Sequence, residues 1–284
     1  MEQKLNSSTN VEGFNVSPTI ANAMLGDVFS PRIEVADNLE FMRSIESNTL
    51  DLIYCDVLYG TGRDFMDYKD LYPMKEIIYE HYEPRIKEMH RILKDTGSIY
   101  LQMDYRIVHW VRCIMDDIFG YGNFRNEIVW CYTMPNNYKK SFNKKHDNIL
   151  FYSKSNNWTF NWKDVTVDYS ESSKNRAKYA HSKTSQMGKN GKMLLDEGKL
   201  VEDYWLIPVV SGNERVKYQT QKPKKIIERI VKASSNENDI VGDFYLGSGT
   251  TAVVCKELSR RFVGCDINTN AVKLTNERLN GMLF

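Results

Sequence analysis

The sequence predicts an α/β fold whose core is a doubly wound, mostly parallel sheet, with a basic insert in the middle of the chain. Short apolar segments of strand length alternate with longer segments of helical period on both sides of that insert. Acidic or glycine-rich turns follow several of the strands. Because sheets of this type bind ligands at the carboxyl ends of their strands, these turns are candidate functional segments.

Residues 31–132 are expected to form the first part of the sheet. Residues 52–55 are an apolar run between Asp51 and Asp56, which is typical of a buried parallel strand. The other elements predicted before the insert are a helix at about 74–94, a turn at 95–97, a strand at 98–103, a helix near 106–119 and a strand at 127–130.

Residues 206–284 are expected to complete the same domain. The elements predicted there are a helix at about 223–234, a strand at 239–244, a helix at about 250–259 and a strand at 261–266. Residues 1–30 are polar and rich in Asn and Ser, and they predict a flexible N-terminal arm.

The composition is that of an ordinary globular protein. The 38 Lys and Arg nearly balance the 37 Asp and Glu, so any nucleic-acid footprint must be local. The five cysteines form no CxxC pair and have apolar or aromatic neighbours, which favours buried, reduced thiols over disulfides or a metal site. No signal-peptide core and no run of the ~18 to 20 apolar residues of a membrane helix is present, so we expect a soluble cytoplasmic protein.

The insert, residues 133–205, is the basic part of the chain. Between residues 138 and 192 it carries twelve Lys or Arg against four Asp or Glu, with little apolar periodicity. Lysines suit contact with phosphate groups, whereas the alternative is a solvated basic loop without a partner. The candidate nucleic-acid contacts are Lys139, Lys140, Lys144, Lys145, Arg176, Lys178 and Lys183.

A glycine turn follows the predicted strand 239–244 and precedes a predicted helix. Glycines let the backbone approach a ligand, and the helix offers free N–H groups. Twenty-three residues after Asp243, Asp266 ends the next strand, where a carboxylate can accept hydrogen bonds from ribose hydroxyls. The turn has neither the Gly-Lys-Ser/Thr of a phosphate loop nor the third glycine of a dinucleotide fingerprint, and a tight turn without ligand remains the alternative. The candidate ligand-binding residues are Asp243, Phe244, Gly247, Ser248, Gly249, Thr250 and Asp266.

An acid and an aromatic residue follow the predicted strand 52–55. The amino nitrogen of adenine or cytosine is a poor nucleophile, and it improves when a carboxylate and a backbone carbonyl accept its hydrogens. Asp56 and the carbonyl of Val57 could do this, while the ring of Tyr59 could stack on a base turned out of its duplex. The alternative is a turn capped by Asp56, with Tyr59 in the core.

Together these motifs resemble the β-class DNA amino methyltransferases, a circularly permuted family in which the acidic motif precedes the recognition insert and the glycine motif comes last. The segments 218–223, 124–130 and 144–150 also look like family segments. The resemblance implies a Rossmann-like methyltransferase fold, S-adenosylmethionine as cofactor, double-stranded DNA as partner, base flipping and a target-recognition role for residues 133–205. It adds four cofactor contacts to those of the glycine turn: Asp37, Thr220, Lys222 and Pro223.

The sequence departs from the family pattern at the acidic motif. Val57 and Leu58 stand where the family has two prolines, which stiffen the loop. The departure leaves a silent DNA-binding subunit as one alternative, and N4-cytosine methylation as another. Asp rather than Ser at position 56 favours adenine, by family tendency. The resemblance also leaves open a homodimer, a cognate restriction endonuclease and a bacterial, archaeal or phage source. His81, His90 and His109 are interpreted as packing or surface residues.

Overall fold

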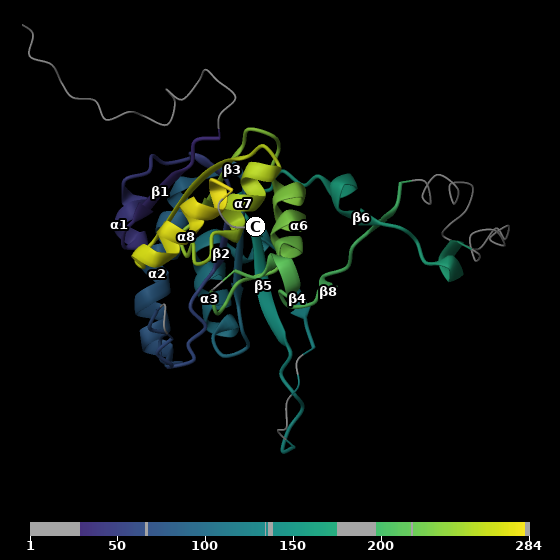
Figure 1. The fold of residues 1–284 in the computed structure, drawn as a ribbon, viewed down its shortest axis with the longest axis horizontal. Coiled ribbons are helices and arrows are strands. Elements are labelled where there is room, and N and C mark those ends of the chain that lie inside the picture. Colours follow the sequence, from purple (N-terminus) through teal and green to yellow (C-terminus); the bar gives the residue numbers. More distant parts are fainter. Residues whose placement is uncertain are drawn as a thin grey trace, which may run out of the picture.

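The structure is a computed structural model that describes residues 29–65, 68–133, 135, 139–174, 197–216 and 218–281. A single eight-stranded sheet crosses it (Figure 1). The strands, in spatial order, are β1 (Arg32–Val35), β10 (Arg261–Asp266), β9 (Ile240–Asp243), β2 (Leu50–Asp56), β3 (Leu93–Met103), β5 (His146–Ser153), β4 (Phe124–Cys131) and β8 (Tyr204–Leu206).

The sheet is mostly parallel, as predicted. The five strands from β1 to β3 run parallel to one another, and β8 runs parallel to β4. β5 alone runs antiparallel to its two neighbours, β3 and β4. A second, two-stranded antiparallel sheet joins β6 (Thr166–Val167) to β7 (Lys199–Leu200).

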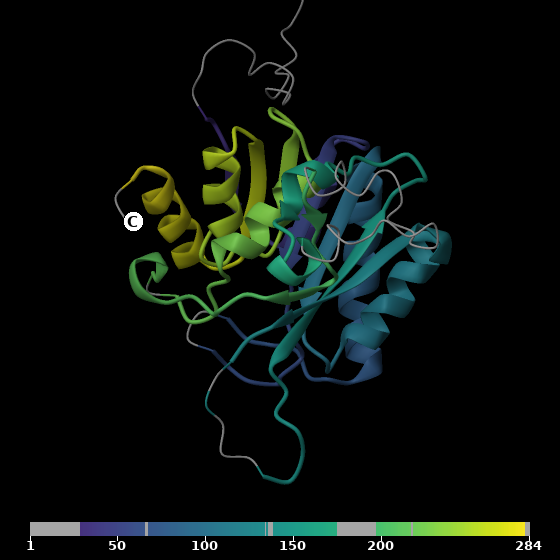
Figure 2. The same cartoon turned by 90° about the vertical axis from the view of Figure 1, so that its right-hand side faces the viewer.

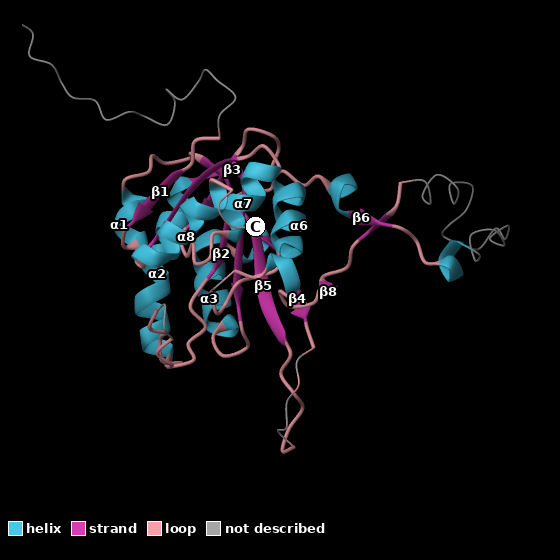
Figure 3. Ribbon diagram, in the orientation of Figure 1, coloured by secondary structure: helices cyan, strands magenta, loops and turns pink. Residues whose placement is uncertain are grey.

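Helices cover both faces of the sheet, which confirms the doubly wound architecture (Figures 2 and 3). One face packs against α1 (Asn38–Arg43), α2 (Lys75–Ile92) and α3 (Val108–Phe119). The other packs against α6 (Lys224–Ser234), α7 (Thr250–Glu257) and α8 (Thr269–Leu279). Alternate residues of β2 serve the two faces: Ile53 and Cys55 enter the first core, and Leu52 and Tyr54 enter the second.

The strand order reverses between the parallel strands β2 and β9. From β2 the chain passes through α2 to β3 on one side, and from β9 it passes through α7 to β10 on the other. Ligands of open α/β sheets bind where the strand order reverses in this way, because the two crossovers leave a crevice between the strand ends. Asp56 ends β2 and Asp243 ends β9, so both acids stand at that crevice.

The predicted elements outside the insert are present, with ends that differ by a few residues. The turn predicted at 95–97 lies instead within β3, since the pairing of β2 jumps from Leu93 to Ser98 and leaves 94–97 as a bulge. β1, α1 and α8 were not anticipated. Cys113 is exposed, contrary to the expected burial, while Cys55, Cys255 and Cys265 are buried and free.

Residues 133–205, which were predicted to be one basic insert, include β5. This strand lies between β3 and β4 in the sheet, so the range is not a single insert. Its residues 149–152 are four consecutive apolar side chains, buried on both faces. The residues around this strand are polar, so the average composition of the whole segment did not indicate a buried strand. Residues 1–28 lie outside the described part of the chain. Of the described helices, none is both long and apolar enough to span a bilayer.

Gly249 precedes α7 with a φ of 74°, and a Cβ atom there would lie 2.6 Å from Cγ2 of the buried Thr275. Gly249→Ala should therefore lower the free energy of unfolding by about 2 to 4 kcal/mol, through left-handed strain and overpacking. Urea unfolding measures this. Gly122→Ala is the matched control, since a Cβ there meets no atom within 4 Å. Equal losses in the two variants would contradict the packing argument.

Candidate functional site

A cavity of about 490 Å³ opens at the carboxyl ends of β2 and β9. It brings together both halves of the chain, including twelve of the fourteen residues predicted for catalysis and cofactor binding. These are Asp37, Asp56, Val57, Tyr59, Thr220, Lys222, Asp243, Phe244, Gly247, Ser248, Thr250 and Asp266. The acidic motif and the glycine turn, remote in sequence, therefore line one space.

Two predicted cofactor residues, Gly249 and Pro223, do not line the cavity. Gly249 packs against Thr275 and allows the sharp entry into α7. Pro223 is buried at the start of α6, where its fixed φ suits the first turn of a helix. Both residues shape the backbone beside the cavity.

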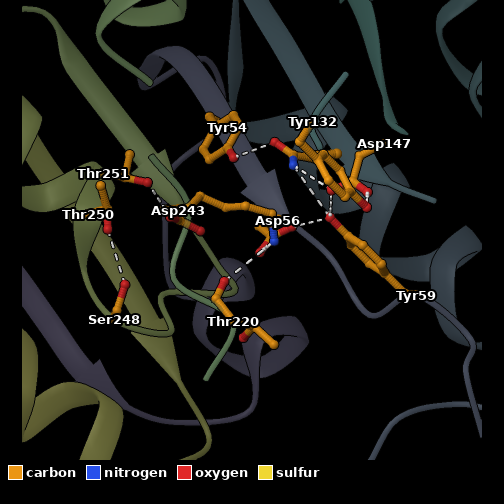
Figure 4. A network of polar contacts seen from close by, with 12 residues as sticks. Tyr54, Asp56, Tyr59, Tyr132, Asp147, Thr220, Asp243, Ser248, Thr250 and Thr251 are labelled. Atoms are coloured by element: carbon orange, nitrogen blue, oxygen red, sulfur yellow. Dashed lines mark hydrogen bonds and ion pairs between the residues drawn. The ribbon is translucent and has the colours of Figure 1, made fainter. Parts of the chain in front are cut away.

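Asp56 is held by two side chains, one on each carboxylate oxygen (Figure 4). The hydroxyl of Tyr59 donates to Asp56 Oδ1 at 2.9 Å, and Lys222 Nζ donates to Asp56 Oδ2 at 2.6 Å. The ammonium of Lys222 also lies 5.0 Å from the centre of the Tyr59 ring. Although the motif resemblance assigned Lys222 to the cofactor, its side chain contacts the proposed catalytic acid.

A second buried carboxylate, Asp147 of β5, completes this network. Its Oδ2 lies 2.6 Å from the Tyr59 hydroxyl and 3.0 Å from Gln102 Nε2, and its Oδ1 lies 3.2 Å from the Tyr132 hydroxyl. The Tyr54 hydroxyl donates to Gln102 Oε1 at 2.8 Å. Sequence reasoning gave Asp147 no role. Asp147 lies in the segment 144–150, and the resemblance of that segment to the family was the one feature of the sequence that pointed to a role for this residue.

The electrostatic surroundings of Asp56 act in opposite directions. Burial raises the pKa of this carboxyl above its ordinary value, the ammonium of Lys222 lowers it, and the charge of Asp147 raises it again. Burial and the two carboxylates together raise the pKa of Tyr59 well above its usual range, so its hydroxyl remains a hydrogen-bond donor at neutral pH.

The loop after Asp56 is fixed by hydrogen bonds in place of the two prolines. The added N–H of Val57 donates to the carbonyl of Gln102 at 3.1 Å and so extends the pairing of β2 with β3. The Tyr82 hydroxyl of α2 donates to the carbonyl of Leu58 at 2.6 Å.

Further along this loop, the buried carboxylate of Asp70 accepts the N–H groups of Gly60, at 3.0 Å, and Thr61, at 2.8 Å. Strand pairing, α2 and Asp70 thus hold the segment at successive points. The substitution of both prolines leaves the loop anchored.

The glycine turn is organised by two carboxylates. Asp243 accepts hydrogen bonds from Thr251 Oγ1 at 2.6 Å and Tyr245 N at 3.1 Å, and burial raises its pKa to about 7. Asp266 accepts from the N–H of Gly247 at 2.8 Å. From α8, the nearly buried Arg278 donates to the carbonyl of Ser248 at 2.5 Å.

A third cluster ties the turn to the opposite wall. Asp37 accepts the N–H of Leu39 at 2.9 Å, capping α1, and also pairs with Arg85 of α2 at 3.0 Å. Arg85 donates to Asn38 at 2.6 Å, and Asn38 donates to the carbonyl of Phe244 at 3.1 Å. These contacts fix the wall in which Asp37 stands.

His81 belongs to the cavity wall, where the sequence suggested only packing or a surface position. Its Nε2 lies 3.0 Å from the hydroxyl of Tyr245. Burial, reinforced by the positive charge of Arg85, lowers its pKa to about 4, so the imidazole is neutral at physiological pH.

The cavity fits S-adenosylmethionine in size and chemistry. Its volume is within the range of small-molecule sites. Asp37, Asp243 and Asp266 provide acceptors and negative charge for a hydroxylated, cationic ligand, and Phe244 and Leu246 provide apolar wall. A doubly wound sheet with these two motifs at one crevice defines the class of S-adenosylmethionine-dependent methyltransferases.

The loop between β4 and β5 extends away from the sheet (Figure 1). It carries four of the seven residues predicted to contact DNA. Lys139, Lys140 and Lys144 are exposed, and Lys145 is half-buried. Phe142, which sequence reasoning missed, is 98% exposed among them. The loop leaves the sheet where Tyr132 and Asp147 join the Asp56 network, so it projects from the edge of the sheet that carries Asp56. Arg176, Lys178 and Lys183 lie outside the described residues.

Comparison with known proteins names the family. Residues 50–277 match the DNA methylase family N6_N4_Mtase. The Type II methyltransferase M1.MboII of Moraxella bovis is 33% identical over 260 residues, covering 88% of this chain and 96% of that protein. M.HpaI of Haemophilus parainfluenzae is 30% identical over 252 residues, with 88% and 74% covered. The DNA adenine methyltransferase YhdJ of Escherichia coli is 29% identical over 248 residues, with 86% and 81% covered.

Solved structures share the fold. M1.HpyAVI in complex with SAM has a TM-score of 0.60 at 20% identity, covering 88% of this chain and 100% of that one. The cytosine-N4-specific PvuII DNA methyltransferase has a TM-score of 0.63 at 15% identity, covering 87% and 85%. The chain belongs to the DNA methylase family, as the motif order indicated.

The raised pKa of Asp243 predicts a pH-dependent stability. The folded protein binds this proton more tightly than the unfolded chain does, so the contribution of Asp243 is most favourable at low pH and is lost as pH rises from about 4 to about 7. Relative to Asp243→Asn, the free energy of unfolding of the wild type should fall by about 3 to 4 kcal/mol across that window. Urea unfolding of both proteins at several pH values measures this, and a constant difference would contradict it.

Proposed function

We propose that this protein methylates the N6 amino group of adenine within a specific sequence of double-stranded DNA, with S-adenosylmethionine as methyl donor. One observation carries the proposal: Asp56 and the glycine turn at 247–249 stand at the tips of the paired strands β2 and β9, beside one cavity. That arrangement can bring an amino group held at Asp56 up to a methyl donor held at the turn.

The chemistry follows from the two acceptors at the strand end. The carboxylate of Asp56 and the carbonyl of Val57 each accept one amino hydrogen, which draws the nitrogen out of conjugation and directs its lone pair toward the methyl carbon. S-adenosylmethionine supplies a methyl group whose bonding electron pair stays on sulfur. The nitrogen forms the new N–C bond, and one N–H proton passes to Asp56.

Tyr59 is the proposed platform for the flipped base. Its hydroxyl is fastened to Asp56 and Asp147, so the ring is held beside the acid that the amino group must reach. Stacking on a fixed aromatic face offsets part of the energy lost when a base leaves its duplex. The cofactor contacts in this proposal are Asp37, Thr220, Asp243, Phe244, Gly247, Ser248, Thr250 and Asp266.

Adenine is favoured over cytosine by two observations. Position 56 is Asp, and the relative YhdJ is a DNA adenine methyltransferase. The cytosine-N4-specific PvuII enzyme shares the fold at only 15% identity. The proposal includes a target-recognition role for the basic segment and a cytoplasmic location for the protein. It also includes a homodimer and a cognate endonuclease.

Incubation with labelled S-adenosylmethionine and mixed-sequence DNA, followed by digestion to nucleosides, should yield labelled N6-methyladenine. Asp56→Ala should reduce turnover by about 100-fold or more while cofactor binding survives, because the acid acts chiefly in the transition state. Asp117→Ala, on the exposed face of α3, is the matched control and should remain active. Labelled N4-methylcytosine would refute the base assignment, and an inactive parent that binds DNA would support a silent subunit.

The loop lysines should contribute to DNA binding through phosphate contact. The double variant Lys139→Ala/Lys140→Ala should weaken DNA binding at all sequences and reduce the slope of log K against log salt by about 1 per lysine lost. Binding titrations at several salt concentrations measure the slope. Lys273→Ala, an exposed lysine of α8, should leave it unchanged. An unaltered slope in the loop variant would refute phosphate contact there.

A further inference from the structure

Lys222 lies where it can control the charge of Asp56. Its ammonium is 2.6 Å from Asp56 Oδ2, and the two side chains are only 11% and 21% exposed. Its second contact is the carbonyl of Thr220 at 3.5 Å. A contact this short between largely buried partners is screened little by water, so it favours the charged form of Asp56 and opposes the effect of burial.

Asp147 acts on the same acid from the other side, through Tyr59. The Tyr59 hydroxyl lies 2.6 Å from Asp147 and 2.9 Å from Asp56. A phenol has one hydrogen to donate, and two carboxylates compete for it. The hydrogen bond that Asp147 takes is therefore withdrawn from Asp56, and the negative charge of Asp147 adds repulsion.

We propose that Lys222 and Asp147 are positioning residues that set the protonation state of Asp56 from opposite sides, Lys222 keeping it ionised and Asp147 favouring its protonation. This inference rests on the proposed function, in which an ionised Asp56 accepts the amino hydrogens. Lys222 would then act on Asp56 rather than on the cofactor, and Asp147, which had no predicted role, would act on the same carboxylate.

The remaining groups around Asp56 do not replace Lys222. Besides Asp147, the phenols and carboxyls that act on this site include Tyr54, Tyr59, Tyr82 and Asp243. The cavity wall also contains the cations Lys69 and Arg85, but Lys69 is exposed, Arg85 is paired with Asp37, and among the described residues only Lys222 forms an ion pair with Asp56. Phenols and carboxyls cannot supply positive charge, whereas burial disfavours the carboxylate. Without the ammonium, the protonated form of Asp56 would be favoured, and that form cannot take up the proton that the amino group releases.

The opposing pair also matches the charge change of the reaction. With all three groups ionised, Asp56, Asp147 and Lys222 carry a net charge of −1. Methyl transfer removes one positive charge from the donor and releases one proton at the nitrogen. Before transfer, the positive charge of the donor balances this −1. When the proton reaches Asp56, the three groups become neutral overall, so the donor and these groups together carry no net charge before or after transfer.

The test compares kcat, at saturating DNA and cofactor, over pH in Lys222→Met, Lys222→Arg and Asp147→Asn. In Lys222→Met the acid limb should move up by about one pH unit or more, which lowers activity about tenfold at pH values below the limb and leaves the alkaline plateau unchanged. Lys222→Arg should keep the wild-type limb, and Asp147→Asn should move it down. A loss in Lys222→Met that is equal at every pH, or shifts of the same sign in Lys222→Met and Asp147→Asn, would overturn the inference.

A second readout needs no turnover. Carbon-13 carboxyl resonances of Asp-labelled protein without ligands, assigned with Asp56→Asn, report the titration of Asp56 directly. Its midpoint should rise in Lys222→Met and fall in Asp147→Asn. Inactivity of the wild type toward DNA would refute the proposed function and leave this titration measurable, whereas an unmoved midpoint in an active enzyme would refute the inference alone. If Asp147→Asn does not fold, the Lys222→Met and Lys222→Arg pair decides.

Discussion

The parallel pairing of β2 with β9 is the contact on which the site depends. The two strands are joined through Leu52 and Ile53, and the N–H of Ile240 donates to Asp51 across 189 residues of sequence. Every residue of the insert, of β3 to β8 and of α6 lies between them in the chain. The entropy of closing such a long loop must be overcome by packing on both faces of the sheet, because no local contact can do it. Once formed, the pairing places Asp56 and Asp243 at adjacent strand tips, and the crevice follows from the opposite directions of the two crossovers.

The crevice places carboxylates where little water reaches them, which costs free energy. Asp56 and Asp243 both have raised pKa values because burial removes water from their carboxylates. The fold offsets this cost unevenly: Asp56 receives the ammonium of Lys222, while Asp243 receives uncharged donors, among them the hydroxyl of Thr251 and the N–H of Tyr245. An incoming cation would satisfy both. The acidic lining therefore suits a sulfonium compound better than a phosphate-bearing nucleotide. Of the two further cations in the wall, Arg85 is already paired with Asp37 and Lys69 is exposed to solvent.

Most of the sheet and much of the site could be predicted from the sequence, since both rest on local patterns. Apolar runs bounded by acids or glycines mark β2, β9 and β10, and they fix Asp56, Asp243 and Asp266 at strand ends. β5 was not predicted, because its four consecutive apolar residues lie within a segment whose average composition is polar. The contact of Lys222 with Asp56, and the place of Asp147 beside Tyr59, depend on strand order and on the path of the chain into α6. No local pattern encodes those, so only the three-dimensional arrangement reveals them.

Val57 and Leu58 affect how the loop after Asp56 would respond to warming. A proline ring restrains its backbone whatever happens elsewhere in the molecule. Here the restraint comes from hydrogen bonds to the carbonyl of Gln102 in β3 and from the hydroxyl of Tyr82 in α2. These hydrogen bonds hold only while β3 and α2 stay folded in place. Partial opening of α2 on warming would then free the carbonyl of Leu58, while the pairing of Val57 with β3 and the contact of Asp70 with Gly60 would persist. The backbone next to Tyr59 would loosen locally and reversibly, at a temperature below that of global melting.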